Sequence, residues 1–112
     1  MNKQISILAL ALMAGAGQAS ADGAAEWARE YPQPDGSPAR SCATCHGNDL
    51  TQPGRHATTG KRIEPLAPSV NPERLGNPNK VEKWLRRNCR WTLNRLCTEA
   101  EKERFVAFIQ SQ

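Results

Sequence analysis

The sequence predicts a small, all-α domain. Three segments carry apolar residues at helical spacing, and no segment reads as a strand. Residues 47–76 are rich in Gly, Pro, Thr and Asn, which predicts one long loop between the helices. The chain has 112 residues, 38% of them hydrophobic and 5% aromatic, which is enough for one domain and excludes a two-domain enzyme.

The first helix is expected over residues 24–31. Apolar and aromatic residues recur there at i, i+3, i+4 and i+7, and Pro32 ends the segment because proline does not continue a helix. The residues of this stripe are Ala24, Trp27, Ala28 and Tyr31.

Two further helices are marked by their N-terminal residues. The second begins at Pro78, after Asn77 as N-cap, and is expected to end at about Asn88. The third opens with the capping box Thr98-Glu99-Ala100-Glu101 and runs toward the C-terminus. The residues expected to face inward are Val81, Trp84 and Leu85 in the second helix and Phe105, Val106, Phe108 and Ile109 in the third.

Residues 1–21 are interpreted as a signal peptide cleaved after Ala21. A short polar head containing Lys3 precedes an apolar run, and Ala19-Ser20-Ala21 has the small-x-small pattern of a cleavage site. The run is shorter than the roughly 20 apolar residues of a membrane span, which argues against a membrane anchor. We therefore expect a periplasmic protein whose mature domain is residues 22–112.

The strongest motif is Cys42-Ala43-Thr44-Cys45-His46, the pattern of c-type haem attachment. Two thiols one helical turn apart add to two vinyl groups of one porphyrin, and the adjacent His46 supplies an axial nitrogen to the iron. A thioredoxin-like redox pair, a zinc half-site and an ordinary disulfide are less favoured, because the chain has no β-α-β pattern and no second Cys-x-x-Cys. The motif predicts one covalently attached haem c.

The sixth iron ligand is not methionine, because both methionines, Met1 and Met13, lie in the expected signal peptide. His56 is one alternative, although its neighbours favour a solvated loop. Asn88 is the other, because it ends the inward stripe of the second helix. On the helix pattern alone, Asn88 fits better as a C-terminal cap residue in the left-handed conformation.

Cys89 and Cys97 are the remaining thiols of the mature chain. In an oxidising compartment we expect them to pair. A disulfide that closes so short a loop stabilises the fold by only roughly 2 to 3 kcal/mol in the chain-entropy model. A more specific use of this disulfide would be to hold position 88 in place.

The charged residues leave two interpretations open. Basic residues of the second helix form either a docking surface for an acidic partner or an ordinary solvated face; they are Lys80, Lys83, Arg86, Arg87 and Arg90. Lys61 or Arg62 is expected to pair with a haem propionate. With two propionates counted, the mature chain is near neutral, so its basic composition does not indicate nucleic-acid binding.

Three stretches closely resemble the sphaeroides haem protein (SHP) family of oxygen-binding cytochromes c. They are residues 41–47 (Ser-Cys-Ala-Thr-Cys-His-Gly), residues 59–69 (Thr-Gly-Lys-Arg-Ile-Glu-Pro-Leu-Ala-Pro-Ser) and residues 81–89 (Val-Glu-Lys-Trp-Leu-Arg-Arg-Asn-Cys), followed by Cys97-Thr98. Cytochrome c double-prime, a related branch, has His where this chain has Asn88, which favours the SHP type.

The resemblance implies a class I-like cytochrome c fold, in which helices and a long loop surround the haem. It implies His46 as proximal ligand, Asn88 as distal ligand and a Cys89–Cys97 disulfide beside it. Cys42 and Cys45 would hold the haem covalently, and we expect Trp84 and Lys61 to contact it.

The resemblance also implies that Asn88 leaves on reduction, so that ferrous haem binds dioxygen, nitric oxide or carbon monoxide. The implied electron donor is a di-haem cytochrome c. Two rival functions remain open. One is a plain low-spin electron carrier with bis-His ligation through His56, and the other is an enzyme such as a nitric oxide dioxygenase or a weak peroxidase. The sequence offers no clear distal acid-base residue for peroxide cleavage.

Overall fold

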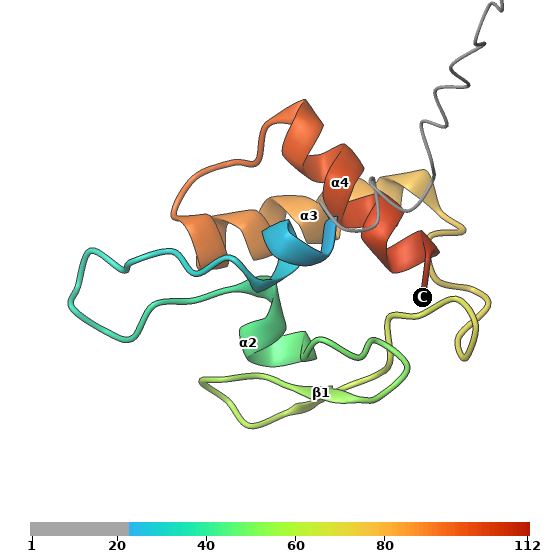
Figure 1. Ribbon diagram of the computed structural model, residues 1–112, viewed down its shortest axis with the longest axis horizontal. Coiled ribbons are helices and arrows are strands. Elements are labelled where there is room, and N and C mark those ends of the chain that lie inside the picture. The colour runs from blue at the N-terminus through green and yellow to red at the C-terminus, as the bar shows by residue number, and fades with distance from the viewer. Residues whose placement is uncertain (1–22) are drawn as a thin grey trace, which may run out of the picture.

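The computed structural model describes residues 23–112. The expected signal peptide and its cleavage after Ala21 therefore lie outside the described residues. The elements in chain order are a helical turn over residues 23–28, α2 (Cys42–His46), β1 (Gly54–Arg55), β2 (Arg62–Ile63), α3 (Pro78–Leu93) and α4 (Glu99–Gln110). Figure 1 shows α3 and α4 on one side of the molecule, with α2 and the small hairpin β1–β2 on the other.

The predicted all-α class is confirmed, with two corrections to its elements. The first helix ends at residue 28 rather than at 31, because Tyr31 leaves the helix to pair with Arg40 in an antiparallel bridge. The Tyr31 amide donates to the Arg40 carbonyl at 2.8 Å, and the Arg40 amide donates back at 3.0 Å. The expectation of no strand was also wrong, since Gly54 and Arg55 pair with Ile63 and Arg62 in a two-stranded hairpin.

The two long helices begin where their caps were predicted. The Asn77 side chain accepts hydrogen bonds from the amides of Asn79 and Lys80, with Pro78 at the first helical position. Thr98 and Glu101 form a reciprocal capping box at the start of α4. These caps satisfy amides that the first turn of a helix leaves without intrahelical partners.

The second helix is longer than predicted and ends at Leu93. Asn94 follows it in the left-handed conformation, with φ of 59°, so Asn94 and not Asn88 is the C-terminal cap residue. The buried face continues past Asn88 through Cys89, Thr92 and Leu93.

The hydrophobic core lies where residues 23–28 cross α4. It also includes residues of the long loop, and its buried members are Trp27, Leu50, Ala67, Phe105, Phe108 and Ile109. A Cβ at Gly23 would lie 2.9 Å from the Cβ of Phe108, so only glycine permits this close crossing. Cys42 and Ala43 of α2 and Leu85 of α3 pack against the same core, which fixes both helices relative to it.

Candidate functional site

The Cys-x-x-Cys-His motif forms the single helical turn α2. Ser41 caps this turn: its hydroxyl accepts a hydrogen bond from the Thr44 amide at 3.1 Å, and Thr44 Oγ1 accepts one from the Ser41 amide at 2.8 Å. A helix of five residues is too short to persist by itself, so the capping box and the core contacts hold it. The turn places both thiols and His46 on one rigid element.

The two thiols of α2 lie in different environments. Cys42 packs against the core, and burial raises the pKa of its thiol to about 12. Cys45 Sγ accepts a hydrogen bond from the Ala57 amide at 3.3 Å. A Cβ at Gly54 would collide with the Cys45 carbonyl oxygen, so glycine allows β1 to lie directly against the motif.

His46 is held by an aromatic neighbour from the N-terminal turn. The rings of Trp27 and His46 pack with centroids 5.6 Å apart, and Trp27 Nε1 donates a hydrogen bond to the Gly47 carbonyl at 2.8 Å. Burial, with a smaller effect of the Arg74 charge, lowers the pKa of His46 to about 4. The imidazole is therefore neutral at pH 7, the form that binds a metal.

The residues of α2 fit haem c. Cys42 and Cys45 are both unpaired, one helical turn apart on an element that already packs against an apolar core. The adjacent neutral imidazole is the nitrogen donor that haem iron takes. Within the described residues no three His, Cys, Asp or Glu side chains cluster as an alternative metal site.

Asn88 lies inside α3, exposed to solvent, and not at the end of the inward face as expected. At 3.6 residues per turn, Trp84, Asn88 and Trp91 form one stripe beside the buried face that carries Leu85 and Cys89. Trp84 is 52% exposed, and the Arg87 guanidinium lies 5.0 Å from its ring centroid. The stripe thus presents two indoles and an amide.

The expected disulfide between Cys89 and Cys97 is present, with a Cα–Cα distance of 5.6 Å. Cys89 is buried in α3, directly after Asn88, and Cys97 precedes the cap residue of α4. The bond therefore ties the part of α3 that carries Asn88 to the start of α4.

His56 lies in the turn between β1 and β2, half-buried rather than fully solvated. Its Nδ1 accepts hydrogen bonds from the amides of Thr58 and Thr59, each at 3.1 Å. Because Nδ1 is the acceptor, the proton of the neutral ring is on Nε2. Binding a metal through Nε2 would require moving that proton to Nδ1 and breaking both hydrogen bonds.

Trp91 and Arg40 form a contact that the sequence did not predict. The Arg40 guanidinium lies 4.2 Å from the Trp91 ring centroid and donates to the Trp91 carbonyl at 3.0 Å. The His56 ring packs against the same indole, with centroids 5.6 Å apart. Trp91 thus joins α3 to the loop before α2 and to the hairpin.

Lys61 and Arg62 are both exposed in the hairpin. The Lys61 carbonyl accepts a hydrogen bond from the His56 amide at 2.8 Å, which closes the turn around His56. Arg62 pairs with Glu64 at 3.1 Å on the surface, so Lys61 is the less engaged of the two cations.

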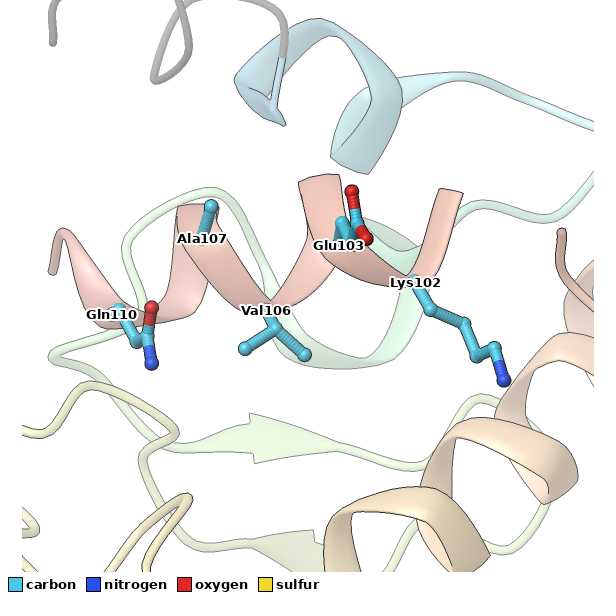
Figure 2. A pocket seen from close by; sticks show the side chains of 5 residues that line it. All are labelled: Lys102, Glu103, Val106, Ala107 and Gln110. Atoms are coloured by element: carbon cyan, nitrogen blue, oxygen red, sulfur yellow. The ribbon is translucent and has the colours of Figure 1, made fainter. Parts of the chain in front are cut away.

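One depression of about 330 Å³ lies on the outer side of α4. Figure 2 shows the five side chains that line it, which are Lys102, Glu103, Val106, Ala107 and Gln110. None of them belongs to the Cys-x-x-Cys-His turn or to the stripe on α3, so this depression is separate from the candidate site. No described helix is both long enough and apolar enough to span a bilayer.

Comparison with known proteins identifies a family model and two relatives. The model described as "Domain of unknown function (DUF1924)" matches residues 13–109. The cytochrome c-type protein SHP of Cereibacter sphaeroides is 49% identical over 72 residues, which are 64% of this chain and 55% of that protein. Cytochrome c'' of Methylophilus methylotrophus is 36% identical over 91 residues, 81% of this chain and 62% of that protein. The chain thus spans less than two thirds of either relative.

Solved structures of the same two relatives share the fold. Oxidised SHP, an oxygen-binding cytochrome c, matches with a TM-score of 0.71 and 37% identity, over 88% of this chain and 97% of that one. Oxidised cytochrome c'' matches with a TM-score of 0.75 and 34% identity, over 83% and 75%. A solution structure of cytochrome c'', which addresses haem-ligand detachment in that protein, gives a TM-score of 0.69 at 35% identity over 81% and 73%.

Proposed function

The chain belongs to the DUF1924 family and is a relative of SHP and cytochrome c'', and from this premise we propose that it is a gas-binding mono-haem cytochrome with His46 and Asn88 as axial ligands. Its haem c is covalently attached, as in c-type relatives. When bound, this group supplies one-electron redox chemistry and a site for a diatomic gas. Cys42 and Cys45 hold it, His46 is the proximal ligand, and Trp84 and Lys61 contact it.

The main observation that supports the proposal is the position of Asn88 within α3. Its amide stands in the interior of α3, exposed, directly before a disulfide-bonded cysteine, while Asn94 takes the role of cap residue. An asparagine in a helix interior costs helix propensity and here has no capping use. A ligand role accounts for an amide at this position, and oxygen binding is a property of the SHP relative.

Because of the chemistry of its amide, Asn88 is expected to bind the haem iron in one oxidation state and to leave it in the other. A neutral, hard oxygen donor suits ferric iron better than ferrous iron, so Asn88 is expected to leave on reduction. The Cys89–Cys97 disulfide limits how far α3 moves when it does. Dioxygen, nitric oxide and carbon monoxide are the ligands that would take its place.

The plain electron carrier with bis-His ligation is the second candidate, and the contacts of His56 argue against it. Ligation through its Nε2 would cost two hydrogen bonds to Nδ1, from Thr58 and Thr59. Each such bond contributes about 1 kcal/mol net. A nitric oxide dioxygenase or weak peroxidase activity would be additional to gas binding.

Optical spectra distinguish these functions. We expect purified holoprotein to be low-spin when ferric and to become high-spin and carbon monoxide-reactive on reduction. A haem that stays low-spin and ignores carbon monoxide in both states would overturn the gas-binding proposal and favour the bis-His carrier.

We also propose export to the periplasm, with residues 1–21 removed, and reduction there by a di-haem cytochrome c or another redox protein. Intact-mass analysis of the exported protein tests the cleavage. A mass corresponding to residues 22–112 plus one haem is expected, and a mass that includes residues 1–21 would contradict it.

A further inference from the structure

The positive charge of the molecule is concentrated on one helix. α3 carries five basic residues and a single acidic residue, whereas the remaining described residues hold nine of each. The basic residues of α3 are Lys80, Lys83, Arg86, Arg87 and Arg90. The single acidic residue, Glu82, is paired with Lys102 of α4 at 2.8 Å.

The five basic side chains, here called the basic face, point away from the core. Lys80, Lys83 and Arg87 recur at i, i+3 and i+7, opposite the buried side of the helix that carries Leu85 and Cys89. All five are exposed, and among the described residues none of them forms an ion pair. Such unpaired like charges raise the local potential rather than stabilise the fold.

Trp84 forms one edge of the basic face. It lies on the stripe that also carries Asn88, it is 52% exposed, and the Arg87 guanidinium stacks over its ring at 5.0 Å. Exposed Trp and Arg side chains are the types enriched among residues that dominate protein interfaces. Because we place Trp84 beside the haem, a protein bound to the basic face lies next to the electron acceptor.

We propose that the basic face of α3, with Trp84 at its edge, docks the acidic surface of the redox protein that reduces this cytochrome. The donor would lose one electron, and the haem held by Cys42, Cys45 and His46 would accept it, with no bond made or broken in the transfer itself. This inference rests on the proposed function, since it requires that the haem be reduced by a protein.

A protein surface fits this face better than a lipid surface. A helix that lies in a membrane interface needs an apolar face buried in lipid, and the apolar face of α3 is already packed in the core. Complementary charge speeds the encounter of the basic face with an acidic protein, and this effect does not require a free apolar face.

The test uses ferric holoprotein and reduced flavodoxin, an acidic electron-transfer protein, as the probe. Stopped-flow reduction rates are measured from about 0.02 M to about 0.5 M salt, because screening at high salt removes the contribution of surface charges. The variants are Lys83→Glu and Arg90→Glu. The matched control is Arg29→Glu, which changes net charge equally at an exposed position outside α3.

We expect each α3 variant to be reduced about 3- to 10-fold more slowly than the parent at low salt and equally fast at high salt. Arg29→Glu should remain within about twofold of the parent. Equal rates for all proteins, or equal slowing by Arg29→Glu, would overturn the docking proposal. Carbon monoxide binding by the reduced parent, measured in the same samples, tests the proposed function separately.

A second experiment tests membrane binding by cosedimentation with vesicles of phosphatidylethanolamine and phosphatidylglycerol. Cosedimentation that is lost in Lys83→Glu but kept in Arg29→Glu would assign the basic face to a membrane and overturn the protein-docking proposal. No cosedimentation, together with the salt-dependent rates above, supports it.

Discussion

Trp27 packs its indole against the imidazole of His46, with ring centroids 5.6 Å apart, and donates a hydrogen bond from Nε1 to the Gly47 carbonyl. One side chain of the N-terminal turn therefore holds both the proposed proximal ligand and the residue that follows it. The same indole packs against Phe105 and Phe108 of α4. The orientation of His46 thus depends on the core that joins the two ends of the described chain.

Replacing Trp27 should affect stability and the haem site together. We expect Trp27→Ala to lower the free energy of unfolding by about 3 to 5 kcal/mol, because it opens a cavity in the core. Trp27→Phe keeps an aromatic ring but loses the hydrogen bond to Gly47 and part of the indole volume, so a smaller loss of about 1 to 3 kcal/mol is expected. Denaturant unfolding of the holoprotein measures both losses, and equal losses would contradict the conclusion that ring packing of Trp27 in the core accounts for most of the cost of Trp27→Ala.

Replacing Asn88 tests the distal ligand. Asn88→Ala should leave ferric haem high-spin and speed ligand binding, whereas Asn88→His should keep it low-spin because imidazole is a stronger ligand. Asn94→Ala is the matched control, since it removes an amide from the end of the same helix. It should reduce stability and leave the spectrum unchanged. A low-spin ferric spectrum in Asn88→Ala would exclude Asn88 as the ligand.

Replacing His56 tests the rival ligand. His56→Ala removes the acceptor of two amides in the hairpin turn and the ring packed on Trp91, so we expect a stability loss of about 1 to 2 kcal/mol. The ferric and ferrous spectra should stay as in the parent protein. Conversion to a high-spin ferric haem would assign the sixth position to His56 instead.

Removing the disulfide should loosen Asn88. The Cys89→Ser and Cys97→Ser double variant is expected to lose roughly 2 to 3 kcal/mol of stability, as the chain-entropy model gives for a loop this short. Because the bond ties the segment carrying Asn88 to α4, the variant should also bind carbon monoxide faster when reduced. Flash photolysis measures that rate, and an unchanged rate would show that the disulfide does not restrain Asn88.

Glu101 makes stability depend on acid pH. Its carboxylate accepts hydrogen bonds from Arg95 at 2.7 and 3.0 Å and from the Thr98 amide at 2.9 Å, and the bonds from Arg95 are the main reason that its pKa falls to about 2. A carboxyl whose pKa is lower in the folded chain stabilises fully above its unfolded pKa of about 4.3 and loses this effect as pH falls toward 2.

Glu101→Gln should therefore cost about 1 to 2 kcal/mol at pH 7, a range that allows for the half-exposed Arg95 partner. The difference from the parent should shrink below pH 4. Glu103→Gln, on the exposed side of α4, is the control and should change stability little. A cost that stays constant from pH 7 to pH 2 would contradict the charge-based account.

The features that sequence predicted correctly are local ones. The Cys-x-x-Cys-His turn, the Asn77 and Thr98 caps and the all-α class depend on residues a few positions apart, whose hydrogen bonds and spacing are encoded in a short segment. The Cys89–Cys97 pairing was predictable too, because two thiols remained once the motif was assigned. The resemblance to SHP, carried by residues 41–98, is confirmed by the comparisons.

Tertiary structure alone decided the boundaries and the contacts around the site. Residues 29–31 leave the helical pattern because pairing of Tyr31 with Arg40 replaces their helical bonds, and α3 continues past Asn88 because Cys89, Thr92 and Leu93 find a core to face. Trp91 meets Arg40 across 51 positions of sequence. Such contacts have no local signature, since they arise only when segments distant in the chain are packed together.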